Sequence, residues 1–197
     1  MDAMLCRIDM HTGDLDAADA WYREKAPREP THLNVMRRYQ YLTQAMVELE
    51  DGRPDTVQLT LAPLEPYVQN CARIIDGIHL NVLTAIALYR KKDERWRERL
   101  TAALDAAAEY RFIRTVSVYG TAVLTLLEVL DWDGDKAWRK RLMAAVRTQA
   151  AFYPHFLEPR LAPGEELTPT ELQILHLLCA DKSNTEIAQI MDVKLST

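Results

Sequence analysis

Glycine is scarce in this sequence, with 6 residues among 197, and runs of β-branched residues are few. Both shortages, beside abundant alanine and leucine, favour helices over strands. No apolar stretch is long enough to span a bilayer, and the N-terminus lacks the basic-then-apolar pattern of a secretory signal. The net charge of −5 provides no basic surface for nucleic acid. We therefore expect a mainly helical, cytoplasmic protein without a membrane partner.

The sequence also has few of the residue groupings that metal binding or catalysis requires. Its cysteines are far apart and odd in number, as reduced thiols of a cytosolic protein are. Its histidines are isolated, and the pair His176 and Cys179, one helical turn apart, has no further ligands nearby. Neither a nucleophile elbow nor a phosphate-binding GxxxxGK[ST] run is present. We expect no metal, no cofactor and no enzymatic activity.

Apolar residues recur at helical spacing along most of the chain. Pro54 suits the first position of a helix, whereas Pro63 and Pro66 must kink or break the helix that contains them. Three tryptophans stand at apolar stripe positions and are predicted to be core residues, while Trp132 stands in a turn and is left open; the three are Trp21, Trp96 and Trp138. The predicted helices cover about 15–22, 35–49, 57–68, 75–89, 96–110, 112–130 and 138–152.

Turn residues separate these helices at nearly constant intervals. Gly13, Gly52, Lys91 and Asp131 are 39, 39 and 40 residues apart. This period predicts an all-α fold, a tetratricopeptide-like α-solenoid of antiparallel helix pairs over residues 1–153, with turns near 52, 92 and 132. A plain helical bundle with helices of similar length is the alternative. Residues 1–12 are short for a first helix, so the first pair looks incomplete and the chain a piece of a longer array.

The first helix of each predicted pair carries polar positions away from its apolar stripe. In a solenoid these helices line the concave face, where ligands usually bind. The positions predict a polar, mildly basic groove for a small effector or a protein segment, although ordinary solvated surface is the alternative. The groove residues are Arg37, Tyr41, Gln44, Arg73, Asn81, Thr84, Arg114, Ser117 and Thr121.

The composition changes after Tyr153. Four prolines and glycines within eleven residues, with no apolar period, predict a partly extended linker over 154–166.

Beyond the linker, Thr168, Pro169 and Glu171 form a capping-box pattern, and Ser183 to Glu186 repeats that pattern fifteen residues later. Ala188 supplies the small residue that two closely crossing helices need. Residues 167–197 therefore predict two short capped helices, the first part of a helix-turn-helix.

The run LTPTELQILHLLCADKSNTEIAQIMDVKLST resembles the start of the LuxR-type DNA-binding domain. The preceding helical part is similar, more loosely, to the repeat sensor of the large MalT-like regulators, which carry an ATP-binding domain, a repeat superhelix and then a DNA-binding domain. The resemblance implies a transcription regulator in which an effector or partner at the repeats controls a DNA reader. The alternative is a tetratricopeptide-like scaffold that binds proteins but not DNA. The matching positions are Leu167, Thr168, Glu171, Leu175, Ser183, Asn184, Glu186, Ile187, Ala188, Val193 and Thr197.

The resemblance implies contacts to the DNA backbone by Ser183, Asn184, Thr185 and Thr197. Asp181 replaces the usual turn glycine, and Lys194 replaces the usual small cap. The chain ends where the recognition helix would begin, and only two lysines face six acidic residues after Gly164. We expect DNA as a partner of the full-length protein only, and no specific DNA binding by this fragment alone. We also expect three apolar side chains to lie uncovered: Leu175, Leu178 and Ile187.

Overall fold

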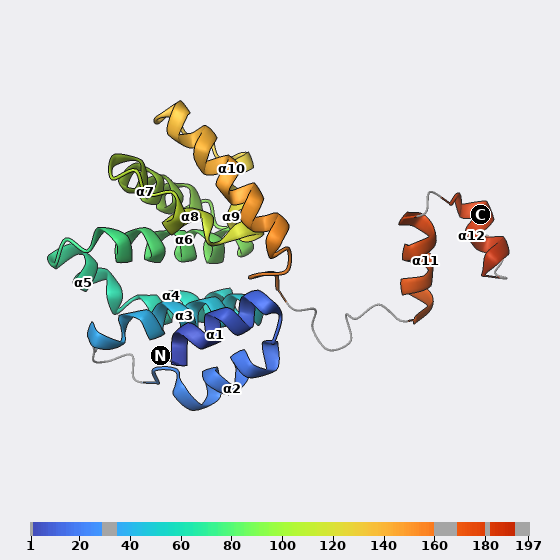
Figure 1. Ribbon diagram of the computed structural model, residues 1–197, viewed down its shortest axis with the longest axis horizontal. Coiled ribbons are helices and arrows are strands. Elements are labelled where there is room, and N and C mark those ends of the chain that lie inside the picture. The colour runs from blue at the N-terminus through green and yellow to red at the C-terminus, as the bar shows by residue number, and fades with distance from the viewer. Residues whose placement is uncertain (1, 29–34, 160–168, 180–181, 192–197) are drawn as a thin grey trace. The chain divides into compact units, whose positions relative to one another are not determined.

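The computed structural model describes residues 2–28, 35–159, 169–179 and 182–191, and every regular element in those ranges is helical (Figure 1). The predicted all-α class is confirmed. The chain divides into two compact units, Met1–Pro159 and Arg160–Thr197. The first unit contains α1 (Asp2–Thr12), α2 (Leu15–Lys25), η1 (Val35–Arg37), α3 (Arg38–Glu50), α4 (Pro54–Leu61), α5 (Leu64–Asn70), α6 (Ile74–Arg90), α7 (Trp96–Glu109), α8 (Arg114–Ser117), α9 (Gly120–Val129) and α10 (Lys136–Phe152).

Helices that are neighbours in sequence pack against each other in pairs: α1 on α2, α3 on α4, α6 on α7, and α9 on α10. Each pair also contacts the next, through α1 and α3, α4 and α6, and α6 and α9. The partners are separated by turns at Asp51–Gly52, Lys91–Lys92 and residues 130–135, so the predicted turns near 52, 92 and 132 are confirmed. A tetratricopeptide-like superhelix stays a prediction. None of the described helices combines the length and apolar content needed to cross a bilayer.

Residues 2–12, which are short for a first helix, form α1 and pack against α2 as the first helix pair. Ala3, Cys6 and Met10 recur at spacings of three and four residues, and all three are buried where α1 packs on α2 and α3. Asp14 then caps α2, because its side chain accepts a hydrogen bond of 3.0 Å from the backbone N–H of Ala17. The short apolar stripe of α1 was therefore sufficient for pairing.

Two of the predicted helices are broken. The prolines do end α4 early, since α4 stops at Leu61 and α5 begins at Leu64, as predicted. The predicted helix over 112–130 was wrong, because the chain forms α8 and α9 with an interruption at Val118–Tyr119. Gly120 has a φ of +49°, in the left-handed region that glycine adopts without steric cost. The apolar stripe continues across the break, which concealed it in the sequence.

The four tryptophans all lie in or against the core. Trp21, Trp96 and Trp138 are buried, so this prediction is confirmed. Trp132, which the sequence left open, is also buried: its ring packs against Trp138 with centroids 5.6 Å apart. Its indole N–H donates a hydrogen bond of 2.8 Å to the Asp105 carboxylate. The turn before α10 is thus part of the core.

The chain after α10 turns back into the first unit. Phe156 and Leu157 are buried, and the ring of His11 stacks on Phe156 at 3.8 Å between centroids. The backbone N–H of Leu157 donates to Glu50 at 3.2 Å, and Arg90 donates to the Leu157 carbonyl. Residues 154–159 therefore belong to the helical unit, and the predicted linker starts too early because its apolar residues find a place in the core. Residues 160–166 lie outside the described residues.

Replacing Phe156 with alanine tests this boundary. Because Phe156 is 2% exposed, we expect the free energy of unfolding to fall by about 3–5 kcal/mol in urea denaturation followed by circular dichroism. Phe152→Ala is the matched control: Phe152 is 74% exposed, so its loss should cost less than about 0.5 kcal/mol. Equal, small effects of the two substitutions would contradict the packing of the turn.

The stability of the helical unit should also depend on pH through His79. Burial lowers the pKa of His79 to about 4 from its ordinary 6.5, and its Nδ1 lies 2.8 Å from the Tyr119 hydroxyl oxygen. The neutral ring is therefore favoured in the fold, so this contribution is present above pH 6.5 and is lost as the pH falls towards 4. We expect a loss of up to about 3 kcal/mol over this range. Urea unfolding of His79→Gln should show a flatter pH profile; an unchanged profile would contradict the assignment.

Candidate functional site

The second unit contains α11 (Pro169–Cys179) and α12 (Asn184–Ile190), which contact each other. Pro169 is the first residue of α11, as predicted, because the missing N–H of proline costs nothing there. The backbone N–H of Lys182 donates to the Leu177 carbonyl at 3.1 Å, which satisfies a carbonyl near the end of α11. Ile187 and Ala188 of α12 are buried. The predicted pair of short helices is therefore present.

Ser183 and Glu186 form the capping box that the sequence predicted for α12. The Ser183 hydroxyl and backbone N–H donate to Glu186 at 2.8 and 2.9 Å, and the Glu186 backbone N–H lies 3.4 Å from the Ser183 hydroxyl oxygen. The N–H of Ser183, with help from its hydroxyl and from Lys182, lowers the pKa of Glu186. The start of α12 is thus held by reciprocal hydrogen bonds. Thr168 of the first predicted box lies outside the described residues.

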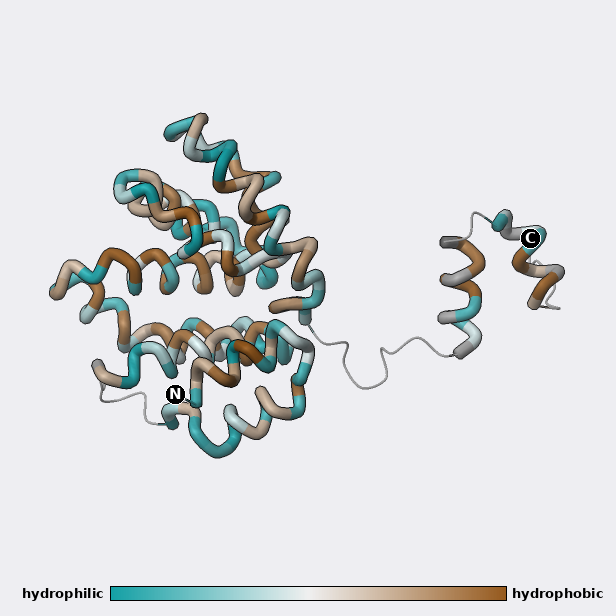
Figure 2. Tube along the Cα trace, in the orientation of Figure 1, coloured by the Kyte–Doolittle hydropathy of each residue, from teal (hydrophilic) through white to brown (hydrophobic). Residues whose placement is uncertain are grey.

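Figure 2 shows apolar residues on both α11 and α12, and some of their side chains remain on the surface of the second unit. Leu175 and Leu178 are exposed, as expected, and Ile190 is exposed as well. Ile187 was expected to be uncovered, but it is 7% exposed because packing within the unit already covers it. An apolar surface of this kind is typical of a helix pair that packs against a further element.

Three of the four residues assigned to DNA contacts meet at the start of α12. Ser183 immediately precedes the helix, Asn184 opens it, and the exposed Thr185 follows in its first turn. The Ser183 hydroxyl is already engaged by Glu186, whereas the Thr185 side chain is exposed. Thr197 lies outside the described residues, as do Asp181 and Lys194.

The structure distributes the predicted groove residues over several hollows. Tyr41 and Gln44 line a pocket of about 440 Å³ formed by α2, α3 and α4, here called the α2–α3–α4 pocket. Asn81 and Thr84 line a second hollow of about 440 Å³, and Thr121 a third of about 160 Å³. The predicted groove residues in these hollows are therefore not parts of one common groove.

The remaining predicted groove residues have mainly structural surroundings. Arg37 donates to the Lys25 carbonyl at 3.1 Å, and Arg73 pairs with Asp76 at 3.0 Å on the surface. Arg114 is exposed, whereas Ser117 is buried in the short helix α8, as Tyr41 and Thr84 are in their longer helices. Their burial follows from helix packing on more than one side, which a single apolar stripe does not reveal.

A buried carboxylate that the sequence pattern did not reveal lies next to the α2–α3–α4 pocket. Glu48 is 1% exposed and accepts hydrogen bonds from Tyr22 at 3.1 Å, Gln44 at 3.0 Å and Thr60 at 2.9 Å. The available signal was an acidic residue between two apolar ones, Val47 and Leu49. Its partners come from α2 and α4 as well as α3, so the cluster becomes recognisable only when those helices are placed.

Residues 165–197 match the family model of the bacterial regulatory proteins, luxR family. The match lies within the second unit and includes α11, α12 and the capping box. This confirms the resemblance of the C-terminal segment to a LuxR-type DNA-binding helix-turn-helix. No match was found among curated proteins or among solved structures.

The capping box can be tested by titrating Glu186. Because the pKa of Glu186 is lowered, its ionised form stabilises α12 at any pH above the ordinary pKa of 4.5. This stabilisation is lost as the pH falls through the lowered pKa. We expect an NMR titration of the Glu186 carboxyl carbon in the whole chain to give a midpoint below 4.5. Ser183→Ala should move the midpoint upward, whereas Ser183→Thr, which keeps the hydroxyl, should leave it low. A midpoint insensitive to Ser183→Ala would contradict the box.

Proposed function

We propose that this chain is part of a bacterial transcription regulator, in which the second unit reads DNA and the helical first unit senses an effector or a partner. The match of residues 165–197 to the luxR family carries this proposal. The capped start of α12 supports it, because Ser183, Asn184 and Thr185 are together where the family resemblance implies backbone contacts to DNA. A protein that reads chromosomal DNA acts in the cytoplasm, which is the proposed location.

The first unit is proposed to be a tetratricopeptide-like sensor of the MalT-like class, in which an ATP-hydrolysing module lies upstream. Its support is the packing of sequence neighbours in successive pairs, which is typical of repeat solenoids. No catalytic role is proposed for these residues.

A scaffold that binds only proteins is the competing function, and the exposed apolar residues Met4, Leu5 and Ile8 on α1 favour it.

Hydrogen bonds suggest a route from the first unit to the DNA reader. Tyr22 and Thr60, which line the α2–α3–α4 pocket, both donate to Glu48 of α3. Two residues later, Glu50 accepts the backbone N–H of Leu157, in the turn that precedes the second unit in the chain. A ligand that shifts α3 would therefore act on the segment from which the DNA reader continues.

DNA selection by the natural protein that carries these residues tests the proposal. From a pool of genomic fragments, we expect enrichment of a defined sequence, confirmed by anisotropy at near-physiological salt. Thr185→Glu places a negative charge where the resemblance implies a phosphate, and should weaken binding about tenfold or more. Gln173→Glu, an equal change of charge at an exposed position of α11, is the control and should have a smaller effect.

Two outcomes would count against this assignment. Failure to enrich any sequence would refute DNA reading and leave the scaffold function. Equal weakening by Thr185→Glu and Gln173→Glu would show a dependence on total charge and not on the start of α12. Glutamate is favourable in the first turn of a helix, so a loss of α12 would not explain the weakening by Thr185→Glu.

A further inference from the structure

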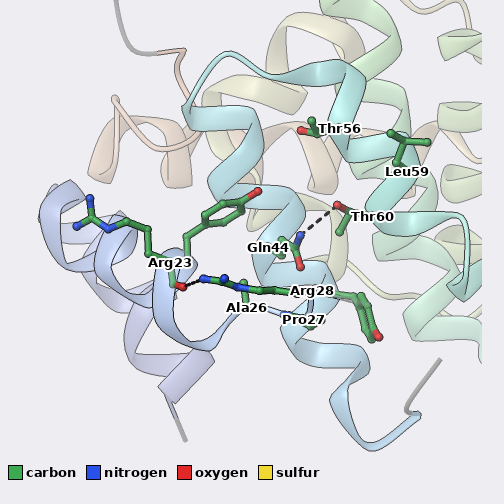
Figure 3. A pocket seen from close by; sticks show the side chains of 10 residues that line it. Arg23, Ala26, Pro27, Arg28, Gln44, Thr56, Leu59 and Thr60 are labelled. Atoms are coloured by element: carbon green, nitrogen blue, oxygen red, sulfur yellow. Dashed lines mark hydrogen bonds between the residues drawn. The ribbon is translucent and has the colours of Figure 1, made fainter. Parts of the chain in front are cut away.

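The α2–α3–α4 pocket has a distinct chemistry on each wall (Figure 3). Arg23 stands on the α2 side, followed by Ala26, Pro27 and Arg28, while Thr56, Leu59 and Thr60 stand on α4 opposite. Gln44 of α3 lies between the two walls. A volume of about 440 Å³ is within the range of sites that hold small organic molecules.

The walls of the pocket are largely apolar. Pro27 and Ala26 cover one side, and Leu59 faces the other with 71% of its surface exposed. Tyr41, which is almost completely buried, lines the pocket as well. Contact between this exposed leucine and the apolar body of a ligand removes apolar surface of both from water, which favours binding.

Two arginines line the pocket: the guanidinium of Arg28 lies across it, whereas that of Arg23, on an exposed side chain, extends away from the other lining side chains (Figure 3). Arg28 crosses it towards Arg23, and its guanidinium donates to the Arg23 backbone carbonyl (Figure 3). In the described part of the chain, no carboxylate forms an ion pair with the side chain of either arginine. The nearby Glu48 is already occupied by its three donors. These cations are therefore available to an anionic group of a ligand.

Gln44 adds a hydrogen-bonding requirement. Its side-chain NH₂ donates to Glu48 at 3.0 Å and lies 3.4 Å from the Thr60 hydroxyl oxygen, which fixes the orientation of the amide. Its carbonyl oxygen, Oε1, is buried and accepts no hydrogen bond from the residues that the structure describes. Buried acceptors in proteins generally have a partner. An O–H or N–H group of a ligand can provide this hydrogen bond after a small shift of the pocket side chains. Arg28 is long and flexible, so it can make such a shift.

We propose that the α2–α3–α4 pocket binds a small organic anion that has an apolar body and one hydrogen-bond donor. Its anionic group pairs with Arg28, and with Arg23 once the exposed Arg23 side chain turns towards the pocket. Its body lies against Pro27 and Leu59, and its donor meets Gln44 Oε1. Binding as such is independent of DNA reading. Only the role of this molecule as the effector rests on the proposed function.

The probe for the test is anilinonaphthalene sulfonate, which combines a sulfonate, an aromatic body and one N–H, and which fluoresces on leaving water. We expect the whole chain to bind it with one-to-one stoichiometry. The double substitution Arg23→Gln/Arg28→Gln should weaken binding about tenfold or more, because it removes both charge-assisted contacts. The double substitution Arg141→Gln/Arg147→Gln removes the same charge from exposed positions on α10, and should change affinity less than about twofold.

Leu59 provides a second, independent pair of variants. Because Leu59 is largely exposed, neither Leu59→Asp nor Leu59→Asn should unfold the chain, which circular dichroism verifies. Leu59→Asp should weaken binding about tenfold, since it adds a like charge beside the anion, and Leu59→Asn distinctly less.

Stoichiometry above one, or equal weakening by the two arginine pairs, would overturn the proposed site. An unchanged affinity in Leu59→Asp would overturn it as well. All these measurements are made without DNA, so they succeed or fail separately from the DNA selection that tests the proposed function.

Discussion

The last turn of α3 buries two carboxylates, and the arrangement of the helical unit depends on satisfying them. Glu48 and Glu50 are each 1% exposed. A buried carboxylate is costly unless hydrogen-bond donors surround it. Glu48 obtains its donors from α2, α3 and α4, and Glu50 accepts the backbone N–H of Leu157. Two neighbouring side chains thus connect the first helices, the pocket and the end of the unit.

Arg90 extends this arrangement to α6. Its guanidinium donates to the Leu49 carbonyl at 2.6 Å and to the Leu157 carbonyl, so it joins the end of α3 to the closing turn. Burial lowers the pKa of Arg90 to about 10, while Glu158 and Glu50 oppose that shift. The group therefore remains a cation at neutral pH, and its charge offsets that of the carboxylates around it. The closing turn is consequently held by charged and apolar contacts together.

Much of the helical architecture was accessible from the sequence because its signals are local. Helix stripes, the turns near 52, 92 and 132, the start of α11 at Pro169 and the capping box of Ser183 and Glu186 all depend on residues within a few positions of each other. The break before Gly120 was missed because apolar residues continue through it, and the linker was placed too early because prolines at 154 and 159 flank two core residues.

The sequence alone determined the helical class, the position of the turns and the LuxR-like character of residues 167–197, since periodicity and capping act along the chain. Tertiary structure alone decided which polar residues line a hollow. Tyr22, Gln44 and Thr60 lie on three helices and meet only because Glu48 is buried among them. The predicted groove residues line several separate hollows, because packing between helices decides which side chains come together. Packing between residues distant in sequence sets which faces of two helices meet. No local pattern in the sequence encodes that choice.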